Sequence, residues 1–387
     1  MARGRTLPRL PELRWWDVAF MAFILSLPIT YIVNGYPSYN AIASLVSRLL
    51  IWGVPYWFGR MCFRSAESAR TLLHATVLGS LIYAPLALWE IRMSPQLHTL
   101  LYGAFQHSFA QMIRGGGYRP IVFTRHGLEL ALWFGVTLIG VVAFRRLGRA
   151  APKWIQASWW VAPAFIALVV MCKSLGATVL SMVAAISIAF RWSRHCLLLV
   201  IVAGSCYVAG RIALDDLVYQ YVLPWLEFLS SERAESFQFR MDNERFLLSR
   251  AWEQPLTGWA PEGFGIINTD GMTREDALAA GTIVKDSLWI ITFGTSGFLG
   301  LCTLYSVLLA GATRCYWDRG ARGVVEVMAL SAIVGIVLLD TVSNSNVNAV
   351  AILFAASSLS VGVDGLSTGS SNRAACKTWS GRVRPRV

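Results

Sequence analysis

Long apolar stretches recur along this chain and constrain its fold more than any other feature. Each runs for about 17 to 20 residues or more, the length of helix that crosses a hydrocarbon core roughly 30 Å thick. The 387 residues are 55% hydrophobic and only 14% charged, and the mean hydropathy is +0.52, which excludes an ordinary soluble globular protein. We therefore predict an all-α, polytopic bundle of membrane helices.

The apolar stretches predict ten membrane spans. They cover residues 17–34, 41–59, 71–90, 127–144, 155–172, 175–191, 196–213, 283–312, 323–340 and 346–363. The first stretch lacks a small-residue cleavage site, so we expect it to remain as a span.

The lengths of the segments between the predicted spans divide the chain into four regions. Seven spans and a first outer loop at 91–126 occupy residues 1–213. A large, partly helical outer loop occupies 214–282, three more spans follow in 283–363, and a basic tail occupies 364–387.

Lysine and arginine are concentrated in one set of connections, which sets the expected orientation. With ten spans, these connections and both termini fall on one side, and an excess of basic residues marks the cytoplasmic side. The basic residues concerned are Arg3, Arg5, Arg9, Arg14, Arg60, Arg64, Arg70, Arg145, Arg146, Arg149, Lys153, Arg191, Arg194, Arg314, Arg319, Arg322, Lys377, Arg382, Arg384 and Arg386.

The opposite, extracytoplasmic side receives the two long loops. The loop at 214–282 contains twelve of the 22 acidic residues but only five arginines. The net charge of +12 therefore reflects orientation in the membrane, and nucleic acid is not an expected partner.

The seven cysteines carry no metal or disulfide signature. No CxxC pair occurs, and none of the cysteines falls in the loop at 214–282. We therefore expect neither a zinc site nor a disulfide framework, and no cofactor. The cysteines are Cys62, Cys172, Cys196, Cys206, Cys302, Cys315 and Cys376.

Charged residues gather at the predicted outer ends of the spans. They are Glu90, Arg92, Glu129, Lys173, Arg211, Asp286 and Asp340. Charges near membrane depth are costly and usually face a cavity or a partner, although each could instead anchor its helix by snorkelling to the interface. A ring of such charges beside polar loops favours a site that opens to the extracytoplasmic side.

The first outer loop contains a group of arginines behind three glycines. Glycines 115–117 allow the backbone to turn back toward the membrane, and four basic residues lie close by: Arg114, Arg119, Arg125 and His126. A guanidinium presents a fixed fork of donors that grips phosphate oxygens. The loop therefore suits an anionic lipid diphosphate, and the alternative is contact with phospholipid headgroups.

The large loop predicts one amphipathic helix, at residues 236–254. The apolar stripe expected on it consists of Phe237, Met241, Leu248 and Trp252. At about 100° per residue, its three arginines point in different directions, so at most one or two can serve one ligand. They are Arg240, Arg245 and Arg250. Pro255 is expected to end the helix.

The passage RMDNERFLLSRAWEQPLTGWAPEGFG, residues 240–265, resembles the signature of the O-antigen polymerase and O-antigen ligase superfamily. In that signature an arginine is followed about fifteen residues later by Pro-Leu-x-Gly and a glycine-rich turn, and Arg240 and Pro255 have this spacing. Three further stretches resemble family segments in the expected order: YRPIVFTRHGLELALWF, KSLGATVLSMVAA and DSLWIITFGTSGFLGL. The likeness covers about residues 100–313.

The resemblance implies a glycosyltransferase with a GT-C-like membrane bundle in the bacterial inner membrane. Its substrate would be an undecaprenyl-diphosphate-linked glycan, joined outside the cytoplasm, with a flippase and a chain-length regulator as protein partners. Matching positions imply diphosphate contacts at Arg119 and Arg240, with Arg125, Arg211 and Arg245 as further candidates.

Two departures from the family pattern favour polymerisation over ligation. Asp286 stands where ligases have a histidine, and Arg125-His126-Gly127 stands where the family has proline-asparagine. We therefore expect polymerisation of lipid-linked repeats into O-antigen, capsule or exopolysaccharide.

A sugar diphosphate is already a good leaving group, so such an enzyme must neutralise the departing phosphate and orient an acceptor hydroxyl. The candidates for the base are Asp286 first, then Glu129 and His126. Three rival functions stay open at this stage, one of which is a purely structural or assembly role for the acidic large loop. A ligase differs only in its acceptor, whereas a secondary transporter would need paired broken helices and internal symmetry.

Overall fold

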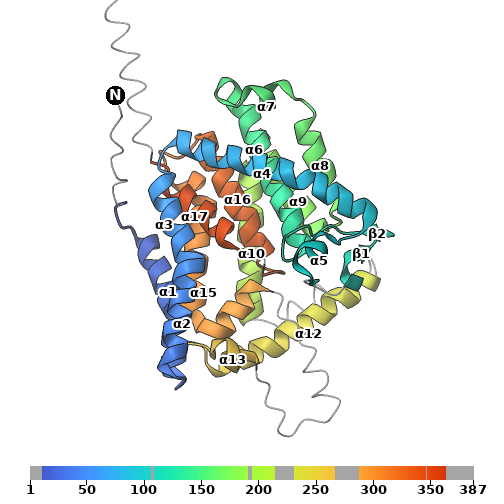
Figure 1. Ribbon diagram of the computed structural model, residues 1–387. Coiled ribbons are helices and arrows are strands. Elements are labelled where there is room, and N and C mark those ends of the chain that lie inside the picture. Colours follow the sequence, from blue (N-terminus) through green and yellow to red (C-terminus); the bar gives the residue numbers. More distant parts are fainter. Residues whose placement is uncertain are drawn as a thin grey trace, which may run out of the picture.

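The protein is almost entirely helical in the computed structural model, which describes residues 11–105, 109–190, 194–213, 231–265, 287–345 and 347–362. Within these residues, strand is limited to a small hairpin of β1 (Ile113–Arg114) and β2 (Gly117–Tyr118). Figure 1 shows a bundle of helices with one helix lying across its lower end. The predicted all-α fold class is confirmed at this level.

The helices follow the predicted apolar segments closely. Their bounds are α1 (Trp15–Val33), α2 (Ser38–Arg48), α3 (Val54–Cys62), α4 (Ala66–Met93), α5 (Leu97–Tyr102), α6 (Gly127–Leu147), α7 (Lys153–Ala157), α8 (Val161–Met171), α9 (Leu175–Ala189), α10 (Arg194–Ala213), α12 (Ser231–Glu253), α13 (Ala260–Gly265), α15 (Leu288–Trp317), α16 (Val325–Asp340) and α17 (Ala349–Ser360). A π-helical turn, Leu49–Gly53, joins α2 to α3. Two 3₁₀ turns cover Phe109–Met112 and Gly148–Ala150.

Five helices among the described residues are long and apolar enough to cross a membrane: α1, α2 with α3, α4, α6 and α15. Each of the other predicted spans also contains a helix, but α8 has only 11 residues and α17 only 12. A helix of that length reaches about 16 to 18 Å, well short of a bilayer core. The structure thus identifies a multi-pass membrane bundle with five candidate spans, where the sequence predicts ten.

Small residues let the central helices approach closely. On α6, a Cβ at Gly135 would lie 1.9 Å from the hydroxyl of Ser181 on α9. On α3, a Cβ at Gly59 would lie 2.7 Å from that of Ala356 on α17. Without a hydrophobic driving force in lipid, such close backbone packing is a main source of helix association.

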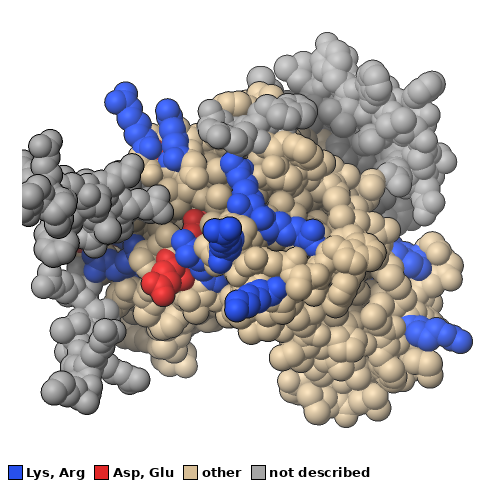
Figure 2. Space-filling model, turned by 90° about the horizontal axis from the view of Figure 1, so that it is seen from above, with Lys and Arg blue, Asp and Glu red and all other residues tan. Residues whose placement is uncertain are grey.

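Arginines gather at the upper end of the bundle, the end that the sequence predicts to be cytoplasmic. Figure 2 shows lysine and arginine side chains collected on this face among fewer acidic ones. Two of the arginines fasten helix ends: Arg60 grips both carboxylate oxygens of buried Asp17 at 2.8 Å, and Arg314 donates to the carbonyls of Ser358 and Val361. These contacts join α1 and α15 to the segments that pack against them.

Helix α12 crosses the opposite end of the bundle (Figure 1). It confirms the predicted helix at 236–254 and ends at Glu253, just before Pro255. Met241 and Leu248 are buried as expected, and Trp252, although 45% exposed, packs edge to face against Phe293 and Phe298 of α15. The side chain of Phe237 lies outside the described residues. Ala251, next to Trp252, is fully buried and extends this face of the helix.

Helix α15 is broken at Gly297, whose φ is +62°. The segment after α12 lies in the break: the amides of Phe298 and Leu299 donate to the carbonyls of Pro255 and Leu256, at 2.7 and 3.3 Å. The amide of Trp259 donates to the carbonyl of Gly294 at 2.8 Å. The Pro-Leu-Thr-Gly segment therefore satisfies the backbone groups that the break exposes, as membrane depth requires.

Candidate functional site

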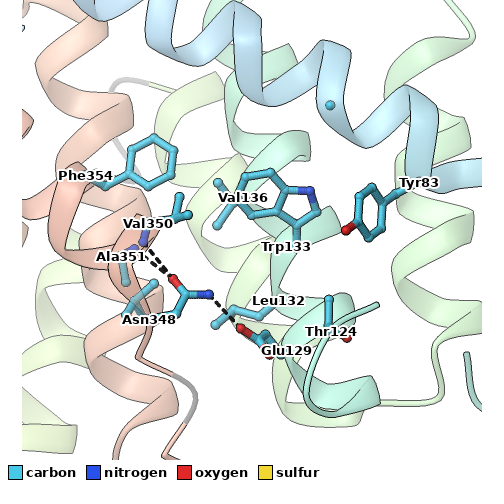
Figure 3. A pocket seen from close by; sticks show the side chains of 12 residues that line it. Tyr83, Thr124, Glu129, Leu132, Trp133, Val136, Asn348, Val350, Ala351 and Phe354 are labelled. Atoms are coloured by element: carbon cyan, nitrogen blue, oxygen red, sulfur yellow. Dashed lines mark hydrogen bonds between the residues drawn. The ribbon is translucent and has the colours of Figure 1, made fainter. Parts of the chain in front are cut away.

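A cavity of about 230 Å³ lies between α4, α6, α16 and α17 (Figure 3). Most of its wall is apolar, and its polar side chains stand at the end nearer α12. The lining residues are Gly79, Tyr83, Thr124, Glu129, Leu132, Trp133, Val136, Val337, Asn348, Val350, Ala351 and Phe354. An apolar cavity with a few convergent polar groups is the usual form of a small-molecule site.

Glu129 supplies the carboxylate of this cavity. It lies in the first turn of α6, and its side chain is 12% exposed. The side-chain amide of Asn348 donates to Oε1 of Glu129 at 2.6 Å (Figure 3). The other oxygen, Oε2, accepts from the backbone amide of Arg125 at 3.0 Å. Both oxygens are thus held in fixed directions at the end of the cavity.

Helix capping explains why these side chains meet. Asn348 is the N-cap of α17, and its Oδ1 accepts from the amides of Val350 and Ala351 at 3.0 Å. Asparagine is a preferred residue there, and the cap leaves its NH₂ group to point at Glu129. His126 is the N-cap of α6, and its Nδ1 accepts from the amide of Leu128 at 3.0 Å. His126 therefore has a capping role in addition to the predicted one.

Arg125 places a positive charge beside Glu129, although it is not one of the residues that line the cavity. Its side chain is 62% exposed, and its guanidinium makes long contacts, 3.6 Å to Glu129 and 3.4 Å to the carbonyl of Val347. Of the predicted diphosphate contacts whose side chains the structure describes, Arg125 is the most accessible.

Aromatic rings form one wall of the cavity. Trp133 lies one helical turn after Glu129 on α6, so both point to the same side, and Tyr83 faces them from α4 (Figure 3). Flat aromatic faces of this kind suit an apolar chain or a sugar ring.

Buried polar contacts fasten the first outer loop to the bundle. Glu90, at the end of α4, accepts from the amides of Ile121 and Val122 at 2.7 Å. Arg119 is 1% exposed and donates to the carbonyl of Lys173 at 2.8 Å. In the structure the Arg119 guanidinium thus holds the loop against the α8–α9 turn, and its role as a diphosphate contact stays a prediction.

Arg211 fastens α12 in a similar way. It is fully buried at the end of α10, 3.4 Å from Glu244 and 3.3 Å from the carbonyl of Met241. Glu244 also accepts from the hydroxyl of Ser287, directly before α15. Arg211, Glu244 and Ser287 thus join α10, α12 and the start of α15. In the structure, Arg211 holds α12 in place, and its role as a diphosphate contact stays a prediction.

The predicted site residues thus fall into three groups. Glu129 lines the cavity, whereas Arg125 and His126 lie next to it at the start of α6 and are not among the lining residues. Arg119 and Arg211 are buried in contacts that hold the two loops, and Arg245 is half-buried on α12. Asp286 and the side chain of Arg240 lie outside the described residues, so their predicted roles stay predictions.

Among the polar and aromatic residues that line the cavity, only Glu129 is a predicted site residue. The others are Tyr83, Thr124, Trp133, Asn348 and Phe354. Asn348 had a local signal, because an asparagine directly before an apolar helix is a typical N-cap. Trp133 follows Glu129 by four residues and so shares its helix face. The contact between Asn348 and Glu129 joins residues 219 positions apart, and no local pattern predicts it.

The arrangement can accept a proton at Glu129 and place a cation beside a bound anion. Among the described residues, no group of three or more His, Cys, Asp or Glu side chains could hold a metal ion. No protein-family model matches the chain, and no curated protein matches it.

Proposed function

We propose that this chain is a membrane glycosyltransferase that polymerises undecaprenyl-diphosphate-linked oligosaccharide repeats into a surface polysaccharide. In this proposal the bundle is GT-C-like, crosses the inner membrane ten times, and has both termini in the cytoplasm; in the crossings at α8 and α17 the helix covers only part of the bilayer core. The cavity beside Glu129 then faces the periplasm, where lipid-linked repeats are joined.

The observation that carries the proposal is the cavity itself. Its apolar wall suits a lipid chain or a sugar face, its polar end contains the carboxylate of Glu129, and the exposed guanidinium of Arg125 lies 3.6 Å from that carboxylate. In the proposed reaction, an acceptor hydroxyl oxygen bonds to the anomeric carbon of the donor, and the bond from that carbon to the diphosphate oxygen breaks. Glu129 takes the hydroxyl proton, and Arg125 faces the negative charge that leaves on the lipid diphosphate.

The test is Glu129→Gln, which keeps the shape of the side chain and removes the proton acceptor. Glu253→Gln, an exposed position on α12, is the matched control. In cells lacking the native protein, we expect the control to restore long glycan chains and Glu129→Gln to leave a single capped repeat at an equal protein level. If cells with the Glu129→Gln variant still make long glycan chains, Glu129 is not the proton acceptor of the reaction.

A ligase would use the same donor chemistry with another acceptor, and the glycans that accumulate distinguish the two. Loss of a polymerase leaves single repeats on the acceptor, whereas loss of a ligase leaves full-length polymer on undecaprenyl diphosphate.

A transporter is the second candidate, and the break in α15 favours it, because broken helices often form transporter sites. In this chain, however, the amides of Phe298 and Leu299 and the carbonyl of Gly294 are paired with the segment 255–259. These groups are therefore not available to coordinate an ion. Glycan elongation by the purified protein in detergent, where no compartments exist, would exclude transport as the sole activity.

A further inference from the structure

The first outer loop contains a long run without a charged residue. No Asp, Glu, Lys or Arg occurs from Met93 to Ile113, and Arg92 and Arg114 flank the run. A loop in water normally carries charges along such a length. An uncharged run with an arginine at each end is instead typical of a segment that lies in the membrane interface.

The structure leaves the apolar side chains of this run uncovered. In α5, Leu100, Leu101 and Tyr102 are 71, 65 and 63% exposed, and farther along Phe109 and Ile113 are 44 and 52% exposed. Five large apolar side chains this close together form a patch of the kind that marks a binding surface.

The patch is continuous with the exposed side of α4. Leu78, Ile82, Trp89 and Met93 follow one face of that helix and are 38 to 69% exposed. Helix α4 is one of the five candidate membrane spans, so we expect this exposed apolar face to meet lipid. Met93 ends α4, and α5 begins four residues later.

The loop is held in place at this position. Besides the amides of Ile121 and Val122, Glu90 accepts from the amide of Leu97, the first residue of α5, at 3.1 Å. Ring contacts join Tyr102 of α5 to Phe123 and Phe123 to Tyr83, with centroids 6.2 and 6.4 Å apart. The exposed patch is therefore built against the bundle.

A groove of about 460 Å³ runs through the patch. Its lining residues are Pro95, Gln96, Thr99, Leu100, Phe105 and Phe109. The mostly apolar lining suits a hydrocarbon chain. The side-chain amide of Gln96 and the hydroxyl of Thr99 could donate hydrogen bonds to the ester groups of a glycerolipid.

We propose that the described residues of this run, 93–105 and 109–113, lie in the extracytoplasmic leaflet of the membrane and that the groove along α5 holds an acyl chain of a leaflet lipid. The aromatic contacts from Tyr102 to Tyr83 then place this lipid-facing segment beside the cavity that contains Glu129. The partner is bilayer lipid, because the patch continues a lipid-facing helix side and the flanking arginines meet headgroup phosphates. This proposal does not rest on the glycosyltransferase activity.

The test places the photo-reactive amino acid benzoylphenylalanine at Leu101 of the full-length chain, in bilayers of phosphatidylethanolamine and phosphatidylglycerol. The same substitution at Ile82, 69% exposed on α4, is the lipid-facing control. Asp242, exposed on α12, gives the background. Tyr102 is a second position in case the Leu101 variant folds poorly.

After illumination, mass spectrometry of the peptides should find phospholipid adducts at Leu101 or Tyr102 at a yield similar to that at Ile82 and several-fold above Asp242. Yields at both α5 positions equal to the Asp242 background, with adducts still formed at Ile82, would overturn the proposal. Cross-links from Leu101 to another protein in native membranes, in place of lipid, would also overturn it.

Discussion

Asn348 determines the geometry of the candidate site although it carries no charge. One end of its side chain caps α17, and the other end holds Glu129 at 2.6 Å. Because a hydrogen bond to a carboxylate is directional and stronger than one between neutral groups, Asn348 fixes where Glu129 points. It is a positioning residue in the proposed reaction.

Asn348→Ser should separate these two roles. Serine caps a helix about as well as asparagine, but it is too short to reach Glu129. We expect the melting temperature to stay close to the original value while the polymerisation rate falls about tenfold, the effect of losing roughly 1.5 kcal/mol of a charge-assisted hydrogen bond. An unchanged rate in the serine variant would mean that Asn348 only caps the helix.

Gly127 makes room for the buried Arg119 side chain. A Cβ at Gly127 would lie 2.5 Å from Cδ of Arg119 and 2.8 Å from the carbonyl oxygen of Pro120. Gly127→Ala should therefore cost about 1 to 3 kcal/mol by overpacking and lower the melting temperature. Gly140→Ala in the same helix, where the nearest atom is 3.5 Å away, is the control. Equal melting temperatures for the two variants would show that Arg119 is not held as described.

At the level of single elements, the break in α15 and the segment 255–259 depend on each other, because each satisfies backbone groups of the other. Gly297 lets the helix change direction, and the carbonyls of Pro255 and Leu256 take the amides that the break exposes. Carbonyl oxygens of Thr257 and Gly258 also accept from Thr30 and Asn34 at the end of α1. The segment thus joins α12 to the middle of the bundle.

Gly297→Ala should disrupt this unit. Its φ of +62° with ψ of −166° is a conformation essentially restricted to glycine, and a Cβ would lie 2.2 Å from the carbonyl oxygen of Leu256. We expect a loss of more than about 3 kcal/mol, seen as a large fall in melting temperature or in folded yield. Gly176→Ala, with no atom within 4 Å, should behave like the original protein. Similar stability of the two variants would contradict the described break.

The sequence predicts a helix correctly where local hydrophobicity alone determines its position. The apolar runs of α1, α4 and α6 and the amphipathic pattern of α12 all fall within a few residues of their predicted bounds, because local hydrophobicity and Pro255 determine them. The break at Gly297 was not predicted, since its cause is the distant Pro-Leu-Thr-Gly segment. The burial of Arg119 was missed for the same reason: the carbonyl that it meets comes from another loop.

At the scale of the whole molecule, charge separates the two ends of the bundle. Arginines gather on the upper face (Figure 2), whereas α12 crosses the opposite end (Figure 1). Glu129, at the polar side of the cavity, lies in the first turn of α6, directly after the first outer loop. The excess of basic residues predicts that the upper face is cytoplasmic. The candidate site is then periplasmic.

Reporter fusions test this orientation. Alkaline phosphatase, which is active only in the periplasm, should be inactive when fused to the C-terminus and active when inserted in the loop at 214–282. Green fluorescent protein should give the opposite pattern. Active phosphatase at the C-terminus would reverse the molecule and place Glu129 in the cytoplasm.

The most direct measurement is an experimental structure of the full-length protein in a lipid nanodisc with an undecaprenyl-diphosphate-linked repeat. We predict density for the substrate at the cavity between α4, α6, α16 and α17, with the diphosphate within contact of Arg125 and the sugar beside Glu129. Substrate bound at the opposite, arginine-rich face, or at a position from which Glu129 is out of reach, would contradict the proposed site.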